Sequence, residues 1–598
     1  MRRLLLFSVF FLSVLSLVAQ TNSYTIAFEN AVHHEANVTV NFPNVSTDTL
    51  EVRMSRSSPG RYALHEFAKN VYSFKATDEN NKPLKVLRKD PYSWSVFDHN
   101  GIVNISYTLF GNRGGGTYSQ IDETHAHLNM PATFMYAPSL KQRKIEITFK
   151  VRDDLNWKVA TQLPLLSGNT YSAPNLYYFM DSPTEISNFG LREFNVNEQN
   201  VRLALHHTGT EDELNTYFKK VKKVVLEQQK VYGELPNFDY DTYTILACYI
   251  PNASGDGMEH RNSTILTSTR SLAQGGMERN IGTVSHEFFH AWNVERIRPK
   301  SLEPFNFAVT NMSGALWFAE GFTSYYTNLI LCRAGLMSAE EYVEGLTGTF
   351  NYVWNSPARQ FFNPIEMSFQ APFVDAATSV DPVNRENTFI SYYSYGSVLG
   401  LALDLSLREK GLHLDDYMKL VWRTYGKSET PYTIANLQES LNRYAGNNFG
   451  DDFFNKYIHT SGMPDYKQLL SAHGVLLQQN LDQAYFGSAA KINDEFNGVL
   501  TSNPKIGSPA YNAGLDNNDV ITRINGQPFP NGQSFDDFIK TLKVGDSLNI
   551  AFERYGDKKT TLVILESDPE YKITLMEKEG EAPSKKILQK RTAWLKRD

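Results

Sequence analysis

The chain has 598 residues, of which 41% are hydrophobic and 13% aromatic, enough apolar material for several packed cores. Its net charge of −7 is small for this length and both signs are mixed along it, so we expect no nucleic-acid partner. Cys248 and Cys332 are the only cysteines, which excludes a scaffold held by several disulfides. The spacing of these two leaves their pairing open.

The N-terminus has the pattern of an export signal. Met1-Arg2-Arg3 precede an apolar run from Leu4 to Val18, shorter than the ~20 residues that usually span a bilayer. We therefore expect residues 1–20 to be a signal peptide. The mature protein would be periplasmic or secreted, without a stable membrane anchor.

Residues 21–195 contain short stretches of alternating apolar and polar residues, broken by Pro, Gly, Asn and Asp. Residues 145–151, with the sequence IEITFKV, are typical. This pattern predicts an N-terminal all-β domain.

The pattern becomes mainly helical in residues 196–478. Asp212 to Tyr232 form an amphipathic stretch, and Tyr240 to Ile250 read as an intervening strand. We take this region as the candidate catalytic domain.

Residues 479–566 return to short strands and resemble a PDZ domain, with Gly507-Ser508-Pro509-Ala510 before a strand and Asn525-Gly526 as a tight turn. Asn518 departs from the pattern, since a glycine is common there. The loop Tyr485 to Ser488 would bind a peptide C-terminus beside an open strand edge. A β-sandwich remnant is the alternative.

In residues 567–598 we expect a basic helix that docks on the body rather than on a membrane.

The segment His286-Glu287-Phe288-Phe289-His290 is the first candidate for chemistry. Histidines four apart on a helix leave the same face one turn apart and can hold one zinc ion, while Glu287 lies beside the metal without ligating it. The alternative is a pair of metal-free histidines in a core.

A catalytic zinc needs a third protein ligand and an open position. Arg296 stands where one large class of zinc peptidases has its third histidine, and Asn293 stands where that class has a glycine, so that class is excluded. Glu320 instead interrupts an apolar helix predicted from Ser313 to Cys332, and a buried carboxylate requires a cation. The predicted cofactor is one Zn²⁺ per chain, held by His286, His290 and Glu320.

These features resemble the gluzincin metallopeptidases, the superfamily of thermolysin and the zinc aminopeptidases. Within it, residues 286–294 followed by Arg296-Ile297-Arg298-Pro299 are similar to the glycyl aminopeptidase family, as are residues 58–62, although Glu295 stands where a lysine is more usual. The resemblance implies a multidomain α+β fold: a β-rich N-terminal domain, a thermolysin-like catalytic domain with a helical C-terminal part, and a PDZ-like domain.

The resemblance also implies where a peptide would bind. In residues 255–260, Gly257, Met258 and Glu259 are similar to an aminopeptidase motif in which the glutamate receives the free α-amino group. An anion at a fixed distance from the metal would place the first peptide bond for attack. The alternative for Glu259 is a solvated ion pair. His260 departs from the asparagine of that motif.

Tyr393 resembles the tyrosine that donates a hydrogen bond to the oxyanion in zinc aminopeptidases. Tyr395 replaces a lysine that is common in the motif. The assignment among Tyr392, Tyr393 and Tyr395 stays open, and each could instead be a packing residue.

The predicted function is a zinc-dependent aminopeptidase that hydrolyses the first peptide bond of peptides with a small N-terminal residue, Gly or Ala, with Glu287 as general base. One alternative is an endopeptidase that uses the same site. The other is a peptide-binding protein whose PDZ-like domain carries the function and whose zinc centre is inactive.

Overall fold

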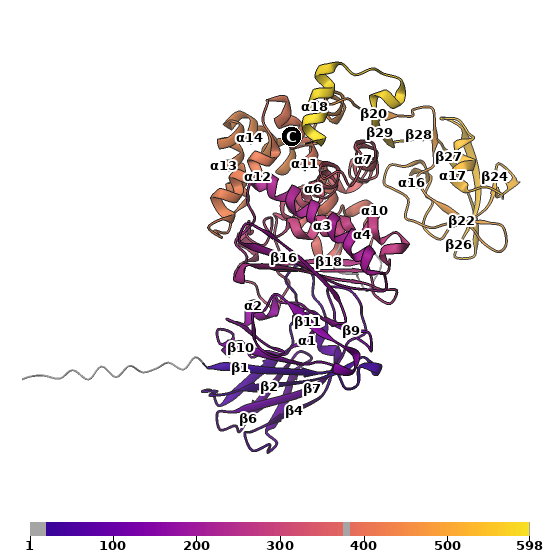
Figure 1. The fold of residues 1–598 in the computed structure, drawn as a ribbon. Helices are drawn as coiled ribbons and strands as arrows, with labels where there is room; N and C mark the ends of the chain where they lie inside the picture. Colours follow the sequence, from indigo (N-terminus) through magenta and orange to yellow (C-terminus); the bar gives the residue numbers. More distant parts are fainter. Residues whose placement is uncertain (1–19, 375–382, 531, 597–598) are drawn as a thin grey trace, which may run out of the picture.

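The computed structural model describes residues 20–374, 383–530 and 532–596, so the predicted signal peptide lies outside it except for Gln20. Figure 1 shows a β-rich N-terminal domain at one end, a helical body at the other, and a small C-terminal β domain beside that body. Among the helices in these ranges, none has the length and apolarity needed to cross a bilayer.

The N-terminal domain is built on a seven-stranded sheet in the order β12-β13-β10-β1-β2-β7-β4. Buried and exposed residues alternate along its strands, as the pattern predicts for a half-buried strand. A smaller sheet, β3-β6-β5, lies beside it. The strands are β1 (Thr21–Ala27), β2 (Glu35–Phe42), β3 (Thr49–Arg53), β4 (Val71–Thr77), β5 (Lys85–Asp90), β6 (Ser93–Phe97), β7 (Val103–Phe110), β10 (Lys144–Lys150), β12 (Leu165–Ser167) and β13 (Thr170–Ala173).

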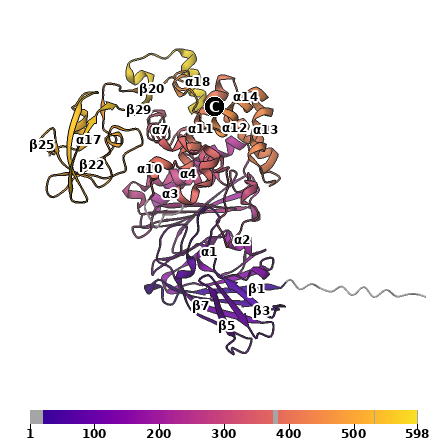
Figure 2. The same ribbon diagram turned by 180° about the vertical axis from the view of Figure 1, so that it is seen from behind.

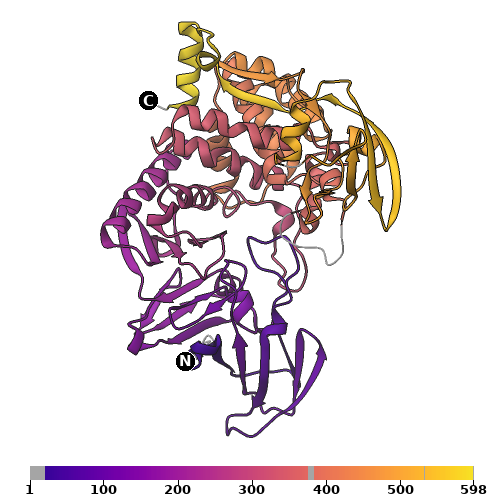
Figure 3. The ribbon, with the colours of Figure 1, turned by 90° about the vertical axis from the view of Figure 1, so that its right-hand side faces the viewer.

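A second sheet of this domain, in the order β11-β14-β9-β8, lies between the large sheet and the catalytic domain (Figures 1 and 3). All residues of β9 and β14 are buried, because β11 and β14 pack against strand β17 of the catalytic domain. The bounds are β8 (Gln120–Ile121), β9 (His125–Leu128), β11 (Lys158–Thr161), β14 (Thr184–Ser187) and β17 (Thr242–Tyr249).

The catalytic domain begins with a five-stranded sheet in the order β15-β16-β17-β19-β18. The central strands β16, β17 and β19 are parallel, and the two edge strands are antiparallel to them. The other strands are β15 (Gly190–Val196), β16 (Gln199–His207), β18 (Asp256–His260) and β19 (Ser263–Ser268). The segment that carries Glu259 is thus an edge strand, and it follows β17 in the chain.

Helices cover the face of this sheet opposite the N-terminal domain. Helix α3 (Glu211–Tyr232) matches the predicted amphipathic stretch: a capping box of Thr210 and Glu213 begins it, and Gly233 in the left-handed conformation ends it. The other helices of the body are α4 (Gly276–Phe289), α5 (Leu316–Ala319), α6 (Gly321–Arg333), α7 (Ala339–Trp354), α8 (Pro364–Phe369), α10 (Arg385–Thr388), α11 (Tyr392–Glu409), α12 (Leu414–Val421), α13 (Ile434–Ala445), α14 (Asn447–Phe453) and α15 (Tyr466–Ser471).

The C-terminal domain has its own hydrophobic core and stands beside the helical body (Figure 2). Its sheet runs in the order β22-β23-β24-β26-β27. Asn525 and Gly526 both have positive φ, as the predicted tight turn requires. Asn518 also has positive φ, +67°, which explains why asparagine can replace the usual glycine. The elements are β22 (Ala490–Ile492), β23 (Gly498–Leu500), β24 (Val520–Ile524), β26 (Ser547–Arg554), β27 (Asp557–Ile564), α16 (Pro509–Asn512) and α17 (Phe535–Lys540).

The end of the chain returns to the helical body. Strand β29 (Tyr571–Leu575) pairs with β20 (Val475–Gln479), and helix α18 (Lys585–Leu595) buries Trp594, whose indole N–H donates to the Tyr325 hydroxyl. Cys248 and Cys332 are both buried and free, so they do not pair. The arrangement confirms the predicted multidomain α+β class.

Candidate active site

Helix α4 carries both histidines of the predicted metal site. Its buried side includes Ile281, Val284 and Phe288, which fix the helix in the core of the catalytic domain. His286 lies in the last turn and His290 directly follows it. Their Nε2 atoms lie 3.6 Å and 3.1 Å, respectively, from Oε2 of Glu320.

The other nitrogen of each ring is fixed by a hydrogen bond. His290 Nδ1 lies 2.6 Å from the carbonyl oxygen of Asn293, which can only accept, so Nδ1 carries the proton. His286 Nδ1 lies 3.1 Å from the hydroxyl of Thr327, which already donates its own proton to the carbonyl of Thr323. Both Nε2 atoms therefore face Glu320, and each could offer its lone pair to a metal bound there.

Glu320 lies between α5 and α6 rather than inside the single helix that the sequence predicts. The close contact of this region with α11 depends on glycines. A methyl group at Gly321 would lie 2.3 Å from the Cα of Gly396, and one at Gly396 would lie 1.8 Å from the carbonyl oxygen of Trp317. Because neither residue has a side chain, α11 and its tyrosines approach the metal ligands.

The three donors fit a metal ion. With metal–ligand distances of ~2.0–2.2 Å, neighbouring donors in a tetrahedral zinc site lie about 3.3 Å apart. The observed 3.1 Å and 3.6 Å are close to this value. Two lone pairs and a carboxylate converge at the same point, an arrangement that is unfavourable unless a cation occupies it.

The surroundings add negative charge. Glu259 and Glu287 lie close to His290, with one donor atom of each within 4.8 Å of the others. Burial lowers the pKa of His290, but the charges of Glu320, Glu259 and Glu287 outweigh it and raise that pKa to about 10. Burial raises the pKa of Glu287 well above its usual range. The shift of His290 shows that the nearby carboxylates favour a positive charge at this position.

Glu287 is buried beneath the edge strand β18. A methyl group at Gly257 would lie 2.2 Å from Oε1 of Glu287, so the backbone of the strand contacts this carboxylate directly. Glu259, which follows Gly257 by two residues in β18, is also buried. Met258 lies between Gly257 and Glu259 in the sequence. Its side chain packs beside Gly60 and Gly116, and its carbonyl accepts from the Thr264 hydroxyl. Of the predicted substrate residues, Glu259 thus borders His290, and Gly257 borders Glu287.

A loop of the N-terminal domain enters the site. The Tyr62 hydroxyl donates to Oε1 of Glu320 at 2.5 Å, which leaves Oε2 to the histidines. Arg61 donates to Oδ1 of Asp256 at 2.5 Å and to the carbonyl of Gly257 at 3.0 Å, so it fixes β18 from the other side. In the sequence, residues 58–62 were marked only by a family resemblance, which assigned them no role.

The three candidate tyrosines of α11 lie in different places. The ring of Tyr393 lies 5.8 Å from that of His286, between centroids. Tyr392 packs edge-on against Tyr62, with centroids 6.0 Å apart. Tyr395 is buried on the side of Ser461 and Tyr466, away from the metal ligands. Tyr393 therefore lies nearest the histidines.

A cavity of about 370 Å³ opens beside the metal ligands. It is lined by the entering loop, the start of β18 and the tyrosines of α11, including Gly60, Arg61, Tyr62, Asp256, Tyr392 and Tyr393. A second cavity of about 250 Å³ lies on the other side of Tyr393, between α6, α7 and α11.

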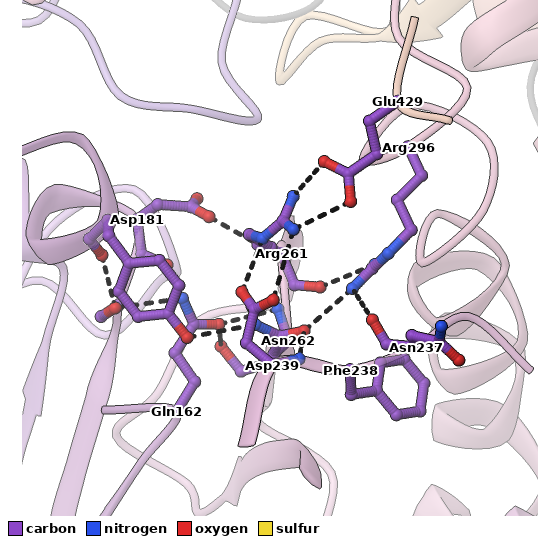
Figure 4. Close-up of polar contacts among 12 residues, drawn as sticks. Gln162, Asp181, Asn237, Phe238, Asp239, Arg261, Asn262, Arg296 and Glu429 are labelled. Carbon is purple, nitrogen blue, oxygen red and sulfur yellow. Dashed lines mark hydrogen bonds and ion pairs between the residues drawn. The ribbon is translucent and has the colours of Figure 1, made fainter. Parts of the chain in front are cut away.

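Behind the site, a polar network fixes the turn between β18 and β19 (Figure 4). Arg261 binds Asp239 and Glu429, and Arg296 donates to the side-chain oxygen of Asn262 at 2.9 Å. The backbone N–H of Arg261 donates to Asp181 of the N-terminal domain at 3.0 Å. The network joins segments of both domains, so the position of β18 is set from both of them.

Two residues that departed from family patterns have structural roles. His260 is buried and lies 2.8 Å from Asp181, so it belongs to this network rather than to the substrate pocket. The Asn293 side chain donates to the carbonyls of Phe318 and Ala319, which ties the end of α4 to the helix before Glu320. No pattern in the sequence indicated this role of Asn293.

Comparison with known proteins identifies the class. Family models match the Peptidase M61 N-terminal domain at residues 23–188, M61 glycyl aminopeptidase at residues 279–399 and a PDZ domain at residues 475–565. The chain is a hydrolytic metallopeptidase. Its N-terminal and catalytic regions match domains of the M61 glycyl aminopeptidase family, as the sequence predicted, and the family implies zinc as the metal.

The fold is shared with one of the solved structures that the chain resembles. An aminopeptidase N family protein from Idiomarina loihiensis superimposes with a TM-score of 0.83 at 23% identity, over 96% of this chain and 100% of that one. An M1 zinc metallopeptidase from Deinococcus radiodurans gives a TM-score of 0.42 at 11% identity, over 75% and 95% of the two chains. Among curated proteins, "Probable periplasmic serine endoprotease DegP-like" of Rhizobium meliloti is 33% identical over 66 residues, which are 11% of this chain and 13% of that protein.

Proposed function

We propose that the protein is a zinc aminopeptidase that removes a small N-terminal residue, glycine or alanine, from peptides. The observation that carries the proposal is the position of Glu259. This carboxylate is buried within a few ångströms of His290 and Glu287, at the edge of the metal site. An anion held there would bind the charged α-amino group of a peptide and place its first carbonyl at the metal.

One zinc ion held by His286, His290 and Glu320 would polarise that carbonyl and increase the acidity of water. Glu287 would accept the proton of the attacking water and then deliver it to the leaving amine, so that one carboxylate acts as base and acid in turn. Its position beside His290 and under Gly257 supports this role. Tyr393 would donate a hydrogen bond to the oxyanion that forms.

The preference for a small first residue follows from the entering loop. A methyl group at Gly60 would lie 2.6 Å from Cγ of Met258 and 3.0 Å from Oε2 of Glu259. The loop therefore packs tightly against the strand that carries Glu259. Little space remains next to this carboxylate for a large side chain.

Two further expectations belong to the same proposal. The apolar run after Met1-Arg2-Arg3 would direct export to the periplasm or outside the cell. The C-terminal domain would bind a peptide C-terminus or strand at the cavity of about 370 Å³ that borders Tyr485, Phe486 and Gly487.

The test is hydrolysis of glycine, alanine and leucine anilides with free and with acetylated amines, each with and without a chelator. We expect cleavage of the free glycine and alanine anilides, little cleavage of acetylated ones, and loss of activity with the chelator. Equal cleavage of acetylated substrates would instead identify an endopeptidase. No cleavage of any substrate by zinc-loaded enzyme would favour a peptide-binding protein.

Glu259→Gln separates the anchor from the metal centre. This variant should raise KM for the free anilides while the bound zinc stays unchanged. Glu278→Gln is the matched control, because Glu278 lies exposed on α4 and pairs with Lys220. Unchanged KM in Glu259→Gln would contradict the anchoring role.

A further inference from the structure

A second cluster of metal-binding side chains lies where the N-terminal domain meets the catalytic sheet. One donor atom from each of His125, His206 and Cys248 lies within 4.8 Å of the other two. His125 begins β9 of the N-terminal domain, whereas His206 and Cys248 are register partners on the parallel strands β16 and β17. The cluster shares no residue with the active site.

The distances within the cluster suit coordination. Cys248 Sγ lies 3.4 Å from His206 Nδ1, and Oε1 of Glu185 lies 3.7 Å from the same nitrogen. In a tetrahedral zinc site with Zn–N of ~2.0–2.1 Å and Zn–S of ~2.3 Å, sulfur and nitrogen ligands lie about 3.6 Å apart.

Two buried atoms in this cluster lack a hydrogen-bond partner. His125 places Nδ1 near Asp122, at 3.3 Å, and near the Thr124 hydroxyl, at 2.9 Å, which leaves its buried Nε2 unpaired. Glu185 directs Oε2 to His127 at 2.8 Å, which leaves its buried Oε1 unpaired. Metal-ligating histidines usually pair their second nitrogen with a carboxylate, as His125 Nδ1 does with Asp122.

The charges of the cluster also balance with a divalent ion. A thiolate and a carboxylate would then neutralise the two positive charges of the metal.

We propose that His125, His206 and Cys248, with Glu185 as fourth donor, form a second zinc site that joins the N-terminal domain to the catalytic sheet. Two imidazoles, a thiolate and a carboxylate favour zinc over calcium or magnesium, which prefer oxygen ligands. Binding requires the Cys248 thiol to lose its proton to solvent. Four protein ligands leave no open position, so the site is structural.

The site would act on catalysis only through domain docking. The N-terminal domain supplies Arg61 and Tyr62 to the active site, and β14 of the same domain packs against β17. A metal bound by residues of β9, β14, β16 and β17 would hold these strands together. The proposed second site depends on the residues of this cluster alone, and it does not depend on the proposed aminopeptidase activity.

The experiment measures zinc in the purified full-length protein after dialysis against metal-free buffer. We expect two zinc ions per chain in the wild type, one in Cys248→Ser and one in His290→Ala. A single zinc ion in the wild type would overturn the proposal. So would a zinc content in Cys248→Ser equal to that of the wild type.

Cobalt substitution identifies the ligands without relying on activity. A cobalt-bound thiolate gives a charge-transfer band in the near ultraviolet, and the proposed active-site ligands contain no sulfur. We expect the band in the wild type, in His290→Ala and in the control Cys332→Ser, and its loss in Cys248→Ser. Absence of the band from the cobalt-loaded wild type would show that Cys248 only hydrogen bonds to His206, even if Cys248→Ser failed to fold.

Discussion

The cluster of His286, His290 and Glu320 contacts Tyr62 and Tyr393, which line a cavity, whereas the cluster of His125, His206 and Cys248 is enclosed between two sheets. At the first, Glu287 and Glu259 lie beside the donors without being needed as ligands. At the second, the nearby carboxylate of Glu185 faces the donors themselves. In the two proposals, similar donor atoms serve a reaction at one site and hold domains together at the other, according to whether acid–base groups and open space lie next to them.

Glu287→Gln is the strongest test that the cluster of His286, His290 and Glu320 serves catalysis. A glutamine keeps the shape of the side chain but cannot carry the proton, so we expect kcat/KM to fall by about 10²–10⁴-fold with unchanged zinc content. Steady-state hydrolysis of glycine anilide and metal analysis measure the two quantities. The control is Glu278→Gln on the exposed face of the same helix. Near-normal turnover in Glu287→Gln would remove this residue from the mechanism.

Tyr393→Phe tests the proposed oxyanion donor. Loss of one such donor lowers kcat by about 10²–10³-fold, and because the bond forms mainly in the transition state, KM should change little. Tyr395→Phe is the matched control on the same helix, since that hydroxyl lies toward Ser461. If Tyr395→Phe lost more activity than Tyr393→Phe, the assignment would be wrong.

The first cluster could be predicted from the sequence because its histidines have helical spacing. His286 and His290 are four residues apart, and Glu320 is an acidic residue in an apolar helix, so local periodicity identified all three. The family resemblance then predicted the domain order, which the fold confirms. The positions of Glu259 and Tyr393 relative to the metal ligands depend on packing between β18, α4 and α11, which no local pattern encodes.

The second cluster could not be found in this way. His125, Glu185, His206 and Cys248 are spread over more than a hundred residues, on strands whose pairing across two domains sets their distances. Likewise, Tyr62 reaches Glu320 from 258 residues away in the sequence. Contacts of this kind follow from register and domain docking rather than from motif spacing.

Tyr62→Phe tests the contact that the N-terminal domain makes with Glu320. The phenol holds Oε1 of Glu320, and loss of such a partner typically weakens metal binding by about 10–100-fold. Competition with a chelator measures the affinity. Because Tyr62 acts through Glu320, saturating zinc should restore most of the activity. Tyr72→Phe, an exposed tyrosine of the same domain, is the control. Unchanged zinc affinity in Tyr62→Phe would contradict the positioning role.

The smallest effect on activity is expected from His127→Leu, beside the second cluster. His127 is the hydrogen-bond partner of Oε2 of Glu185, and its loss leaves a buried carboxylate oxygen unpaired, which costs about 1–3 kcal/mol. Denaturant unfolding should show this decrease, while kcat/KM stays within about twofold, since small losses of stability far from the chemistry leave the folded enzyme intact. His33→Leu, at an exposed position of the same domain, should change the unfolding free energy by less than about 0.5 kcal/mol. A loss of turnover in His127→Leu as large as that in Glu287→Gln would show that the two clusters are coupled, because the domain interface would then control the geometry of the metal ligands directly.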